Sequence, residues 1–381
     1  MNDQPFLPFA KPHISKDAIA EVVHCLHSGW ITTGPRVEKF EQMLSDYHGG
    51  RRAMCVSSAT AGLHLALTAL NLKPDDEVIT TPLTFVATLN TIVLAGAKPI
   101  LVDIDPSTLN MDASRIEAAI TTRTRAIMPV HFAGLPCDLE AIYRLGKRHK
   151  LRIVEDCAHA IGAEYKGRRI GSFGDIQVFS FHANKNITTG EGGAIVTGDK
   201  TIIDTIERLR FHGIDRNAPN RPAKAGSQEY DVVVPGYKCN MMDIQAALGI
   251  HQLPLLDMFI EKRTKLVRRY VDALTNSKFI LPGTPPYVHK HAWHLFTPRL
   301  TRYDRNNFID EMKAAGIGVG LHYQPAHVFS WYRERYGWKP ADFPHALNNA
   351  QRIMSLPLFP TMTEAEQTRV IKTTEKILST V

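Results

Sequence analysis

The chain has 381 residues and a net charge of +7, and its hydrophobic and charged fractions, 44% and 22%, are those of an ordinary globular protein. No apolar run is long enough to cross a membrane, and the N-terminus lacks the apolar core of a signal peptide, so we expect a cytoplasmic protein without membrane insertion. The five cysteines include no Cys-x-x-Cys pair, so we expect neither a disulfide framework nor a metal site. The basic excess favours a phosphorylated small molecule over nucleic acid, because no aromatic residues interleave the densest basic runs, residues 147–150 and 261–269.

The N-terminal part predicts two helices joined by a short loop. Ser15 can cap a helix that ends at Leu26 and carries Ile19, Val22, Val23 and Leu26 on one face. A second helix is expected at residues 37–47. Between them lies a loop, residues 29–35, with Trp30 and two threonines.

From residue 53 onward, short β-rich runs alternate with helical segments. Helices are expected at residues 60–70, 85–95, 113–120 and 139–149. The expected strands are residues 53–56, 77–80, 99–103, 126–131, 152–155, 176–179 and 194–197. This alternation predicts an α/β fold with a mostly parallel seven-stranded sheet and helices on both faces. Ligands of such sheets bind beyond the carboxyl ends of the strands.

Polar and aromatic groups follow three of these strands. Residues 57–62 place small and hydroxyl side chains at a helix N-terminus, where backbone N–H groups can bind an anion, although an ordinary cap is an alternative. Phe85 could cover a flat ligand or belong to the core. Asp156 could pair with a protonated ring nitrogen or cap the next turn.

A lysine, Lys185, lies on a turn rich in glycine and hydroxyl groups between the last two strands. Burial of a lysine at such a place lowers its pKa, because desolvation disfavours the ammonium. The neutral amine can then attack a carbonyl and form a Schiff base. Taken alone, the stretch also fits a surface lysine on a hairpin.

The second half of the chain predicts a smaller α+β domain, so that the division is 13–250 and 251–381. Residues 217–228 predict a mobile loop, and a long amphipathic helix at residues 255–274, after Pro254, is expected to bridge the two domains. His291 and His294 lie in a strand-like run and are expected to be polar lining. The other expected helices are residues 202–211, 242–253, 306–315 and 364–378.

Together, Lys185, Asp156, the anion-binding turn and Phe85 match the needs of one cofactor, pyridoxal 5′-phosphate. This cofactor requires a lysine, an acid beside its ring nitrogen, a phosphate site and a ring platform.

The chain resembles the DegT/DnrJ/StrS sugar-nucleotide aminotransferases, a family of fold-type I pyridoxal-phosphate enzymes. The motifs that carry the resemblance are GWITTGP (29–35), SSATAGLHLAL (57–67), PLTFVAT (82–88), EDCAHAIGAEYKG (155–167), SFHANKNITTGEGG (180–193) and PGYKCNMMDIQAALG (235–249). The stretches 291–296, 316–327 and 355–363 are most similar to the branch that makes UDP-4-amino-4-deoxy-L-arabinose for lipid A modification.

The resemblance implies a role for each matching residue. Lys185 would form the Schiff base and Asp156 would face the pyridinium. The phosphate would be held by Thr60, Ala61 and Ser180, and by Asn240 from the neighbouring subunit. Phe85 would stack on the ring, where the arabinose enzyme has tryptophan, and His159 would lie near the ring oxygen. Trp30, His322 and Tyr323 are candidates for substrate contacts.

The resemblance also implies a reaction. A homodimer with shared sites would move an amino group from L-glutamate to the C4 ketone of a UDP-linked keto-sugar, with pyridoxamine 5′-phosphate as the intermediate form of the cofactor. The alternatives are a UDP- or dTDP-linked 4-keto-6-deoxy-hexose as substrate, or a non-enzymatic regulator that binds nucleic acid. A sugar dehydratase of the same family would lack the lysine, so Lys185 argues against that reaction.

Overall fold

The computed structural model describes residues 5–215, 230–275 and 278–379; the predicted loop at 217–228 lies outside them. The fold is built on a seven-stranded sheet with the strand order β1-β9-β8-β5-β4-β2-β3. Neighbouring strands are parallel except that β9 runs antiparallel to both β1 and β8. The strands are β1 (Arg52–Val56), β2 (Glu77–Thr80), β3 (Lys98–Leu101), β4 (Thr124–Ile127), β5 (Arg152–Asp156), β8 (Ile176–Ser180) and β9 (Gly193–Thr197). The predicted mostly parallel sheet is therefore confirmed.

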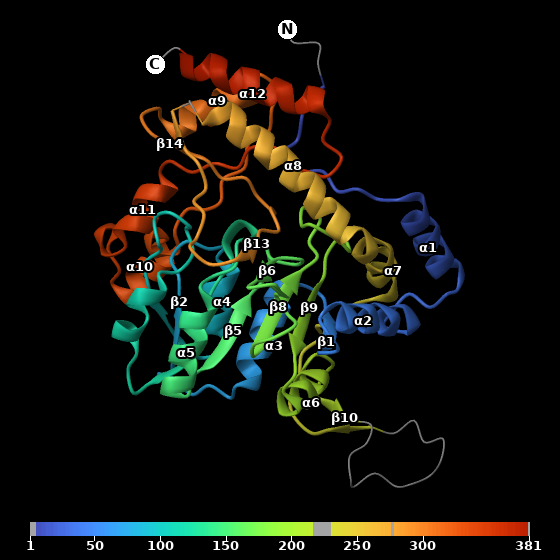
Figure 1. Ribbon diagram of the computed structural model, residues 1–381. Helices are drawn as coiled ribbons and strands as arrows, with labels where there is room; N and C mark the ends of the chain where they lie inside the picture. Colours follow the sequence, from blue (N-terminus) through green and yellow to red (C-terminus); the bar gives the residue numbers. More distant parts are fainter. Residues whose placement is uncertain (1–4, 216–229, 276–277, 380–381) are drawn as a thin grey trace.

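Helices cover both faces of this sheet (Figure 1). One face packs against α3 (Ala59–Ala69), α4 (Ala87–Leu94) and α6 (Lys200–Leu209). The other packs against α2 (Pro35–Tyr47), α5 (Leu139–His149), α7 (Asp243–Gln252) and the start of α8 (Leu256–Leu274). Successive side chains of a strand point to opposite faces, so Met54 and Val56 join the first layer while Ala53 and Cys55 join the second.

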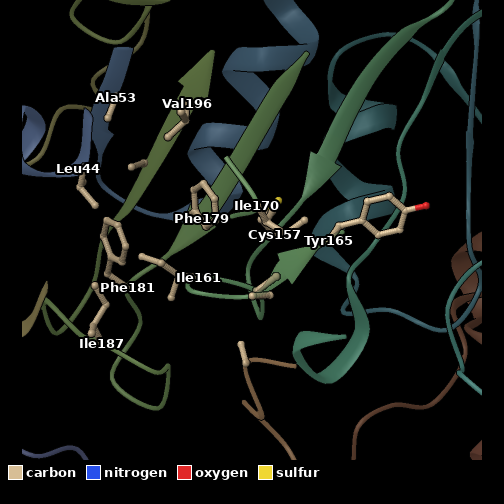
Figure 2. Close-up of a cluster of buried hydrophobic side chains, with 14 of the residues drawn as sticks. Leu44, Ala53, Cys157, Ile161, Tyr165, Ile170, Phe179, Phe181, Ile187 and Val196 are labelled. Atoms are coloured by element: carbon tan, nitrogen blue, oxygen red, sulfur yellow. The ribbon is translucent and has the colours of Figure 1, made fainter. Parts of the chain in front are cut away.

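A buried cluster beneath the sheet holds the loop that carries Lys185. Phe179 on β8 packs with Phe181 and Ile187, which flank the loop, and with Leu44 of α2 (Figure 2). Each large apolar side chain buried in this way stabilises the fold by about 2 kcal/mol. The lysine is therefore presented from an anchored loop, with buried side chains on both sides of it in the sequence.

The long helix α8 connects the sheet to a second core. Its first turns pack with the sheet cluster, whereas Val267, Tyr270 and Leu274 pack with the C-terminal layer. In Figure 1, α8 runs diagonally from α7 to α9 (Arg305–Ala314) and α12 (Glu364–Ser379), and the two ends of the described chain lie on that side. The N-terminal segment also joins this layer, since Leu7 forms a bridge with Ile317.

The remaining elements are short. Two helices that the sequence did not predict, α10 (Ser330–Tyr336) and α11 (Pro344–Ala350), lie in the C-terminal half, and α1 (Lys16–His27) begins at the predicted cap, Ser15. The short strands pair as β6 (Glu164–Tyr165) with β7 (Arg168–Arg169) and β13 (His289–Lys290), as β10 (Ile214–Asp215) with β11 (Asp231–Val232), and as β12 (Phe279–Ile280) with β14 (Arg299–Leu300). Within the residues described, no helix is both long and apolar enough to cross a bilayer.

Two predictions of local structure were wrong. The expected helix at 113–120 is a pair of 3₁₀ turns, η1 (Ala113–Arg115) and η2 (Glu117–Ala119), because Asp112 accepts hydrogen bonds from both the backbone and the side chain of Ser114 and so favours a turn. The strand-like run at 291–296 forms no strand. Only Phe296 makes a bridge, to Leu356, and Trp293 adopts a left-handed backbone conformation with φ of 46°.

Candidate active site

A cavity of about 370 Å³ opens at the carboxyl ends of the parallel strands, where the alternation of strands and helices predicts a ligand. Strands β5 and β8, the N-terminal ends of α3 and α4, and the loop after β8 supply most of its wall. Eight of the residues predicted from the sequence line it: Thr60, Phe85, Asp156, His159, Ser180, Lys185, His322 and Tyr323. The fold thus brings together side chains that are separated by more than 250 positions in the chain.

The other three predicted residues do not line this cavity. The backbone N–H of Ala61 is already bound to Ser58 Oγ at 3.1 Å. Trp30 is 54% exposed on the surface, and its indole N–H donates to the carbonyl oxygen of Thr33. The side chain of Asn240 bonds Thr33 and Lys238. Asn240 does not cap the following helix, which begins at Asp243 with Met242 in the capping position.

Lys185 lines the cavity with an amine of unusually low basicity. Burial lowers the pKa of this amine from its ordinary value of 10.5 to about 8, and the nearby Asp156 carboxylate opposes the shift. A base with a pKa near 8 can take up and release protons at physiological pH. The alternative of an ordinary surface lysine on a hairpin is therefore wrong.

Asp156 ends β5 and is buried in the cavity wall. One carboxylate oxygen accepts a hydrogen bond from Thr88 Oγ1 at 2.8 Å, and the other accepts one from the N–H of Ala158 at 3.1 Å. Thr88 in turn contacts Thr84 at 2.8 Å. Burial raises the pKa of Asp156, whereas these hydrogen bonds oppose the rise. A cationic ring nitrogen beside it would favour the ionised carboxylate.

Another part of the cavity wall has the features of an anion site. Ser58 caps α3, and Ala59 and Thr60, the first two residues of this helix, line the cavity. The first N–H groups of a helix lack partners within it, and the helix dipole favours a negative charge there. Ser180 adds a hydroxyl at the end of β8, so a phosphate group could be held between the two elements.

Aromatic and imidazole rings form the remaining wall. Phe85 is 56% exposed, so the alternative that it belongs to the core is wrong. Its ring centroid lies 5.9 Å from that of Tyr323. The Tyr323 hydroxyl lies 3.0 Å from His159 Nε2, and His159 Nδ1 accepts the backbone N–H of Ala133 at 3.2 Å. With Nδ1 acting as acceptor, the proton of neutral His159 lies on Nε2, which donates to Tyr323.

Two contributors to this site were missed or only partly recognised in the sequence. Thr88 supports Asp156, and the spacing of four residues between Thr84 and Thr88 was the available signal. His294 was expected only as polar lining, but its Nε2 lies 3.4 Å from the amine of Lys185.

A second polar cluster lies beneath the site, on the other side of β5. His131, Glu155 and Cys157 offer ligand atoms within 4.8 Å of one another. However, His131 Nδ1 accepts the N–H of Cys137, and its Nε2–H donates to Glu155 at 2.9 Å. Glu155 also accepts a hydrogen bond from Tyr143 at 2.6 Å. With its polar atoms already paired, this cluster is a hydrogen-bond network that fixes the strand carrying Asp156.

A cavity with these groups at the carboxyl edge of a mostly parallel sheet defines a pyridoxal-phosphate enzyme of fold-type I. The profile of the DegT/DnrJ/EryC1/StrS aminotransferase family matches residues 12–375, and the chain belongs to this family.

Sequence and structure comparisons agree with this assignment. The chain is 44% identical to the spore coat polysaccharide biosynthesis protein SpsC of Bacillus subtilis, covering 98% of this chain and 97% of SpsC. Its fold matches Spr1654 of Streptococcus pneumoniae in the pyridoxamine-phosphate form with a TM-score of 0.92 and 34% identity, over 98% and 99% of the two chains. It also matches Helicobacter pylori PseC, an aminotransferase of pseudoaminic acid biosynthesis, with a TM-score of 0.91 and 28% identity, over 99% and 100%.

The protein is thus a pyridoxal-phosphate-dependent sugar aminotransferase, and its cavity fits the cofactor. Lys185 supplies a weakly basic amine, Asp156 supplies a buried carboxylate, and the N-terminus of α3 with Ser180 supplies donors for a phosphate. The exposed Phe85 ring offers a flat surface at the same cavity. These are the four features that the cofactor requires of a protein.

Proposed function

We propose that this enzyme transfers the amino group of L-glutamate to the C4 ketone of a UDP-linked keto-sugar, forming a UDP-4-amino-sugar and 2-oxoglutarate. A product of the UDP-4-amino-4-deoxy-L-arabinose type, used in lipid A or envelope polysaccharide, is the first candidate. The observation that carries the proposal is the amine of Lys185, which has a pKa of about 8 and lies in one cavity with the buried Asp156 carboxylate.

Each residue has a proposed task in this reaction. Pyridoxal phosphate supplies a carbonyl that takes up the amino group and a ring that takes up electrons from the donor's Cα–H bond. Lys185 anchors the cofactor, and its released amine carries a proton between the donor and the cofactor. Asp156 keeps the ring nitrogen protonated. Thr60 and Ser180 hold the phosphate, and Phe85 covers the ring.

The sugar nucleotide is proposed to extend from the cavity to its mouth. A volume of about 370 Å³ lies at the lower end of the range for ligand pockets, so the nucleotide is proposed to lie outside the cavity. His322 and Tyr323 line the cavity and are proposed to contact the sugar. Lys185 is the only lysine or arginine among the described residues that line the cavity, so cations for the diphosphate must come from elsewhere.

A second copy of the chain is proposed to supply part of the site. Exposed apolar side chains gather on α1, on the loop that follows it and just before α7: Ile19, Val23, Leu26, Trp30, Ile31 and Met242. Such a patch is typical of a protein–protein interface. Asn240 and Trp30 lie on this surface, outside the cavity of their own chain, and would reach the cavity of the partner, Asn240 contacting its phosphate.

The proposed sugar and nucleotide specificity is tested with a panel of substrates. Purified enzyme is incubated with glutamate and each of several UDP- and dTDP-linked 4-keto-sugars, and the products are identified by mass spectrometry. Amination of UDP-linked sugars alone is expected, and exclusive use of dTDP-linked sugars would refute the nucleotide assignment.

The role of Lys185 is tested separately. Borohydride reduction of the holoenzyme should leave the cofactor attached to the Lys185 peptide. Lys185→Ala should lose transamination but still bind pyridoxamine phosphate, because the groups that hold the phosphate and ring remain. Near-parental turnover by this variant would refute the assignment, and absence of any bound cofactor would favour the non-enzymatic alternative.

A further inference from the structure

His294 comes from the C-terminal half of the chain and yet contacts the amine of Lys185. Its Nε2 lies 3.4 Å from Lys185 Nζ, and only 3% of the residue is exposed. The two residues are 109 positions apart in the sequence. The imidazole is therefore within hydrogen-bond reach of the amine.

The backbone around His294 is built to hold it there. Trp293 adopts a left-handed conformation with φ of 46°, which is costly for a bulky residue and usually marks a functional constraint. The guanidinium of the buried Arg263 donates to the carbonyl oxygens of Trp293 and His294, each at 3.2 Å. Asn186, next to Lys185, donates to the carbonyl oxygen of Ala292 at 2.7 Å. The loop of the lysine and the turn of the histidine are therefore tied together.

A glycine on the facing loop permits this close approach. Gly134 has a φ of +97°, and a Cβ atom there would lie 3.2 Å from the backbone nitrogen of His294 and 2.8 Å from the carbonyl oxygen of His159. Its own carbonyl oxygen accepts the N–H of Ala292 at 2.9 Å. Three separate segments thus converge to place one imidazole beside one amine.

The hydrogen bonds of His294 decide which tautomer it adopts. Among the residues that the structure describes, its buried Nδ1 has no hydrogen-bond partner. A buried N–H without a partner is rarer in proteins than an unpaired acceptor, so the proton of the neutral ring belongs on Nε2. An Nε2–H group facing Lys185 can donate to an unprotonated amine, whereas it would repel an ammonium.

We propose that His294 is a positioning residue for Lys185, which donates a hydrogen bond from Nε2 to the free amine and so favours the neutral form of this amine and aims it into the cavity. The inference rests on the proposed role of Lys185 in the reaction. The amine that is freed when a donor amino acid enters must be neutral in order to take a proton. His294 favours that form at every stage in which the lysine is free.

Other titratable groups also act on this amine. Burial and the charge of Lys185 lower the pKa values of His159, His294 and His322, so these three rings do not compete with the lysine as cations at neutral pH. Asp156 acts in the opposite direction by favouring the ammonium. The groups that face Lys185 or line the same cavity are Asp156, His159, His182, Glu191, His294, His322 and Tyr323.

The test measures the titration of Lys185 in the full chain freed of cofactor. Trace labelling with acetic anhydride from pH 6 to 11, followed by peptide mass spectrometry, gives the fraction of unprotonated Lys185 relative to the exposed Lys200. Loss of one hydrogen bond to the neutral amine in His294→Phe should raise the pKa of Lys185 by roughly half a unit to one unit, which lowers its labelling at pH 7 about threefold to tenfold.

Three further variants test whether the pKa shift of Lys185 depends on a hydrogen-bond donor at the position of His294 Nε2. His294→Asn, whose amide is too short to reach the amine, should give the same upward shift and carries the test if the phenylalanine variant does not fold. His294→Gln places an amide donor near the position of Nε2 and should restore the parental titration. His48→Phe, which replaces a buried imidazole that stacks on Phe179 and does not line the cavity, should leave the titration of Lys185 unchanged.

An unchanged or lowered pKa of Lys185 in folded His294→Phe or His294→Asn would overturn the proposal, as would failure of His294→Gln to restore it. These outcomes are independent of the borohydride test. That test asks whether Lys185 carries the cofactor, whereas the labelling is performed without cofactor.

Discussion

Replacement of Lys185 by methionine should stabilise the cofactor-free chain at neutral pH while it abolishes transamination. Methionine has a similar length but no charge, so it fills the same space without a desolvation penalty. The wild-type lysine bears that penalty, because burial lowers its pKa from 10.5 to about 8. Site residues of this kind are retained for catalysis at a cost in stability.

The size of the effect follows from the two pKa values. At 1.36 kcal/mol per unit, a pKa of about 8 in the folded chain and 10.5 in the unfolded chain corresponds to a penalty of ~3.4 kcal/mol. Lys185 as a whole is only half-buried, so solvent screening reduces this figure. We expect Lys185→Met to raise the free energy of unfolding by about 1–2 kcal/mol at pH 7.

The pH dependence of this stability difference shows whether desolvation of the amine causes it. Below pH 8 the lysine is protonated in both states, and the wild type carries the whole penalty. Between pH 8 and 10.5 the unfolded chain binds more protons than the folded chain, so wild-type stability rises with pH until the penalty is gone. The difference between wild type and Lys185→Met should therefore be constant from pH 6 to 8 and should disappear by about pH 10.5.

Urea unfolding of both cofactor-free chains, followed by circular dichroism at one protein concentration, measures this difference. Lys200→Met is the matched control, because the side chain of Lys200 is 86% exposed and its removal should change little. The attraction between the Asp156 carboxylate and the ammonium is already contained in the pKa of about 8, because it opposes the effect of burial. A difference that does not vary between pH 8 and 10.5 would refute the argument that the amine is desolvated.

Three other experiments test the proposed site. Asp156→Ala should still bind the cofactor but slow the half-reaction with glutamate by orders of magnitude, because an unprotonated ring is a poor electron sink; an unchanged spectral half-reaction would remove Asp156 from the mechanism. Raising the salt concentration should weaken sugar-nucleotide binding more than cofactor binding, since charge pairs at the mouth are screened; equal sensitivity in titration calorimetry would contradict a charged mouth. Inactive Lys185→Ala and Asn240→Ala chains should regain activity when mixed, because one site of the mixed dimer then carries neither lesion. Subunit exchange shown by mass spectrometry without recovery of activity would exclude a shared site.

Local patterns in the sequence were sufficient to predict most of the elements of the fold. Alternation of β-rich runs with amphipathic segments predicted all seven strands of the central sheet, because a strand or helix must present its apolar face to the core at a fixed period. Turn and capping residues such as Ser15 and Ser58 were also recognisable, since they act on neighbours three positions away. Placement of Asp156 and Lys185 at one edge of the sheet followed from strand polarity.

Where a segment depends on distant partners, its own sequence was misleading. The run at 291–296 has the composition of a strand, but Arg263 and Asn186 bind its carbonyl groups and Trp293 turns left-handed. The 3₁₀ turns after Asp112 are a second case in which the local sequence was misleading. There, a hydrogen bond to the Asp112 side chain outweighed the helical periodicity.

The contact between His294 and Lys185 was decided by tertiary structure alone. Nothing local to either residue specifies their distance of 3.4 Å, which depends on the packing of α8, the loop at Gly134 and the loop after β8. The same holds for the amine itself, because its pKa of about 8 is set by burial, and burial is a property of the assembled cavity. The sequence alone determines the types of side chain and their spacing. Desolvation and contacts across 109 residues arise only when separate segments pack together.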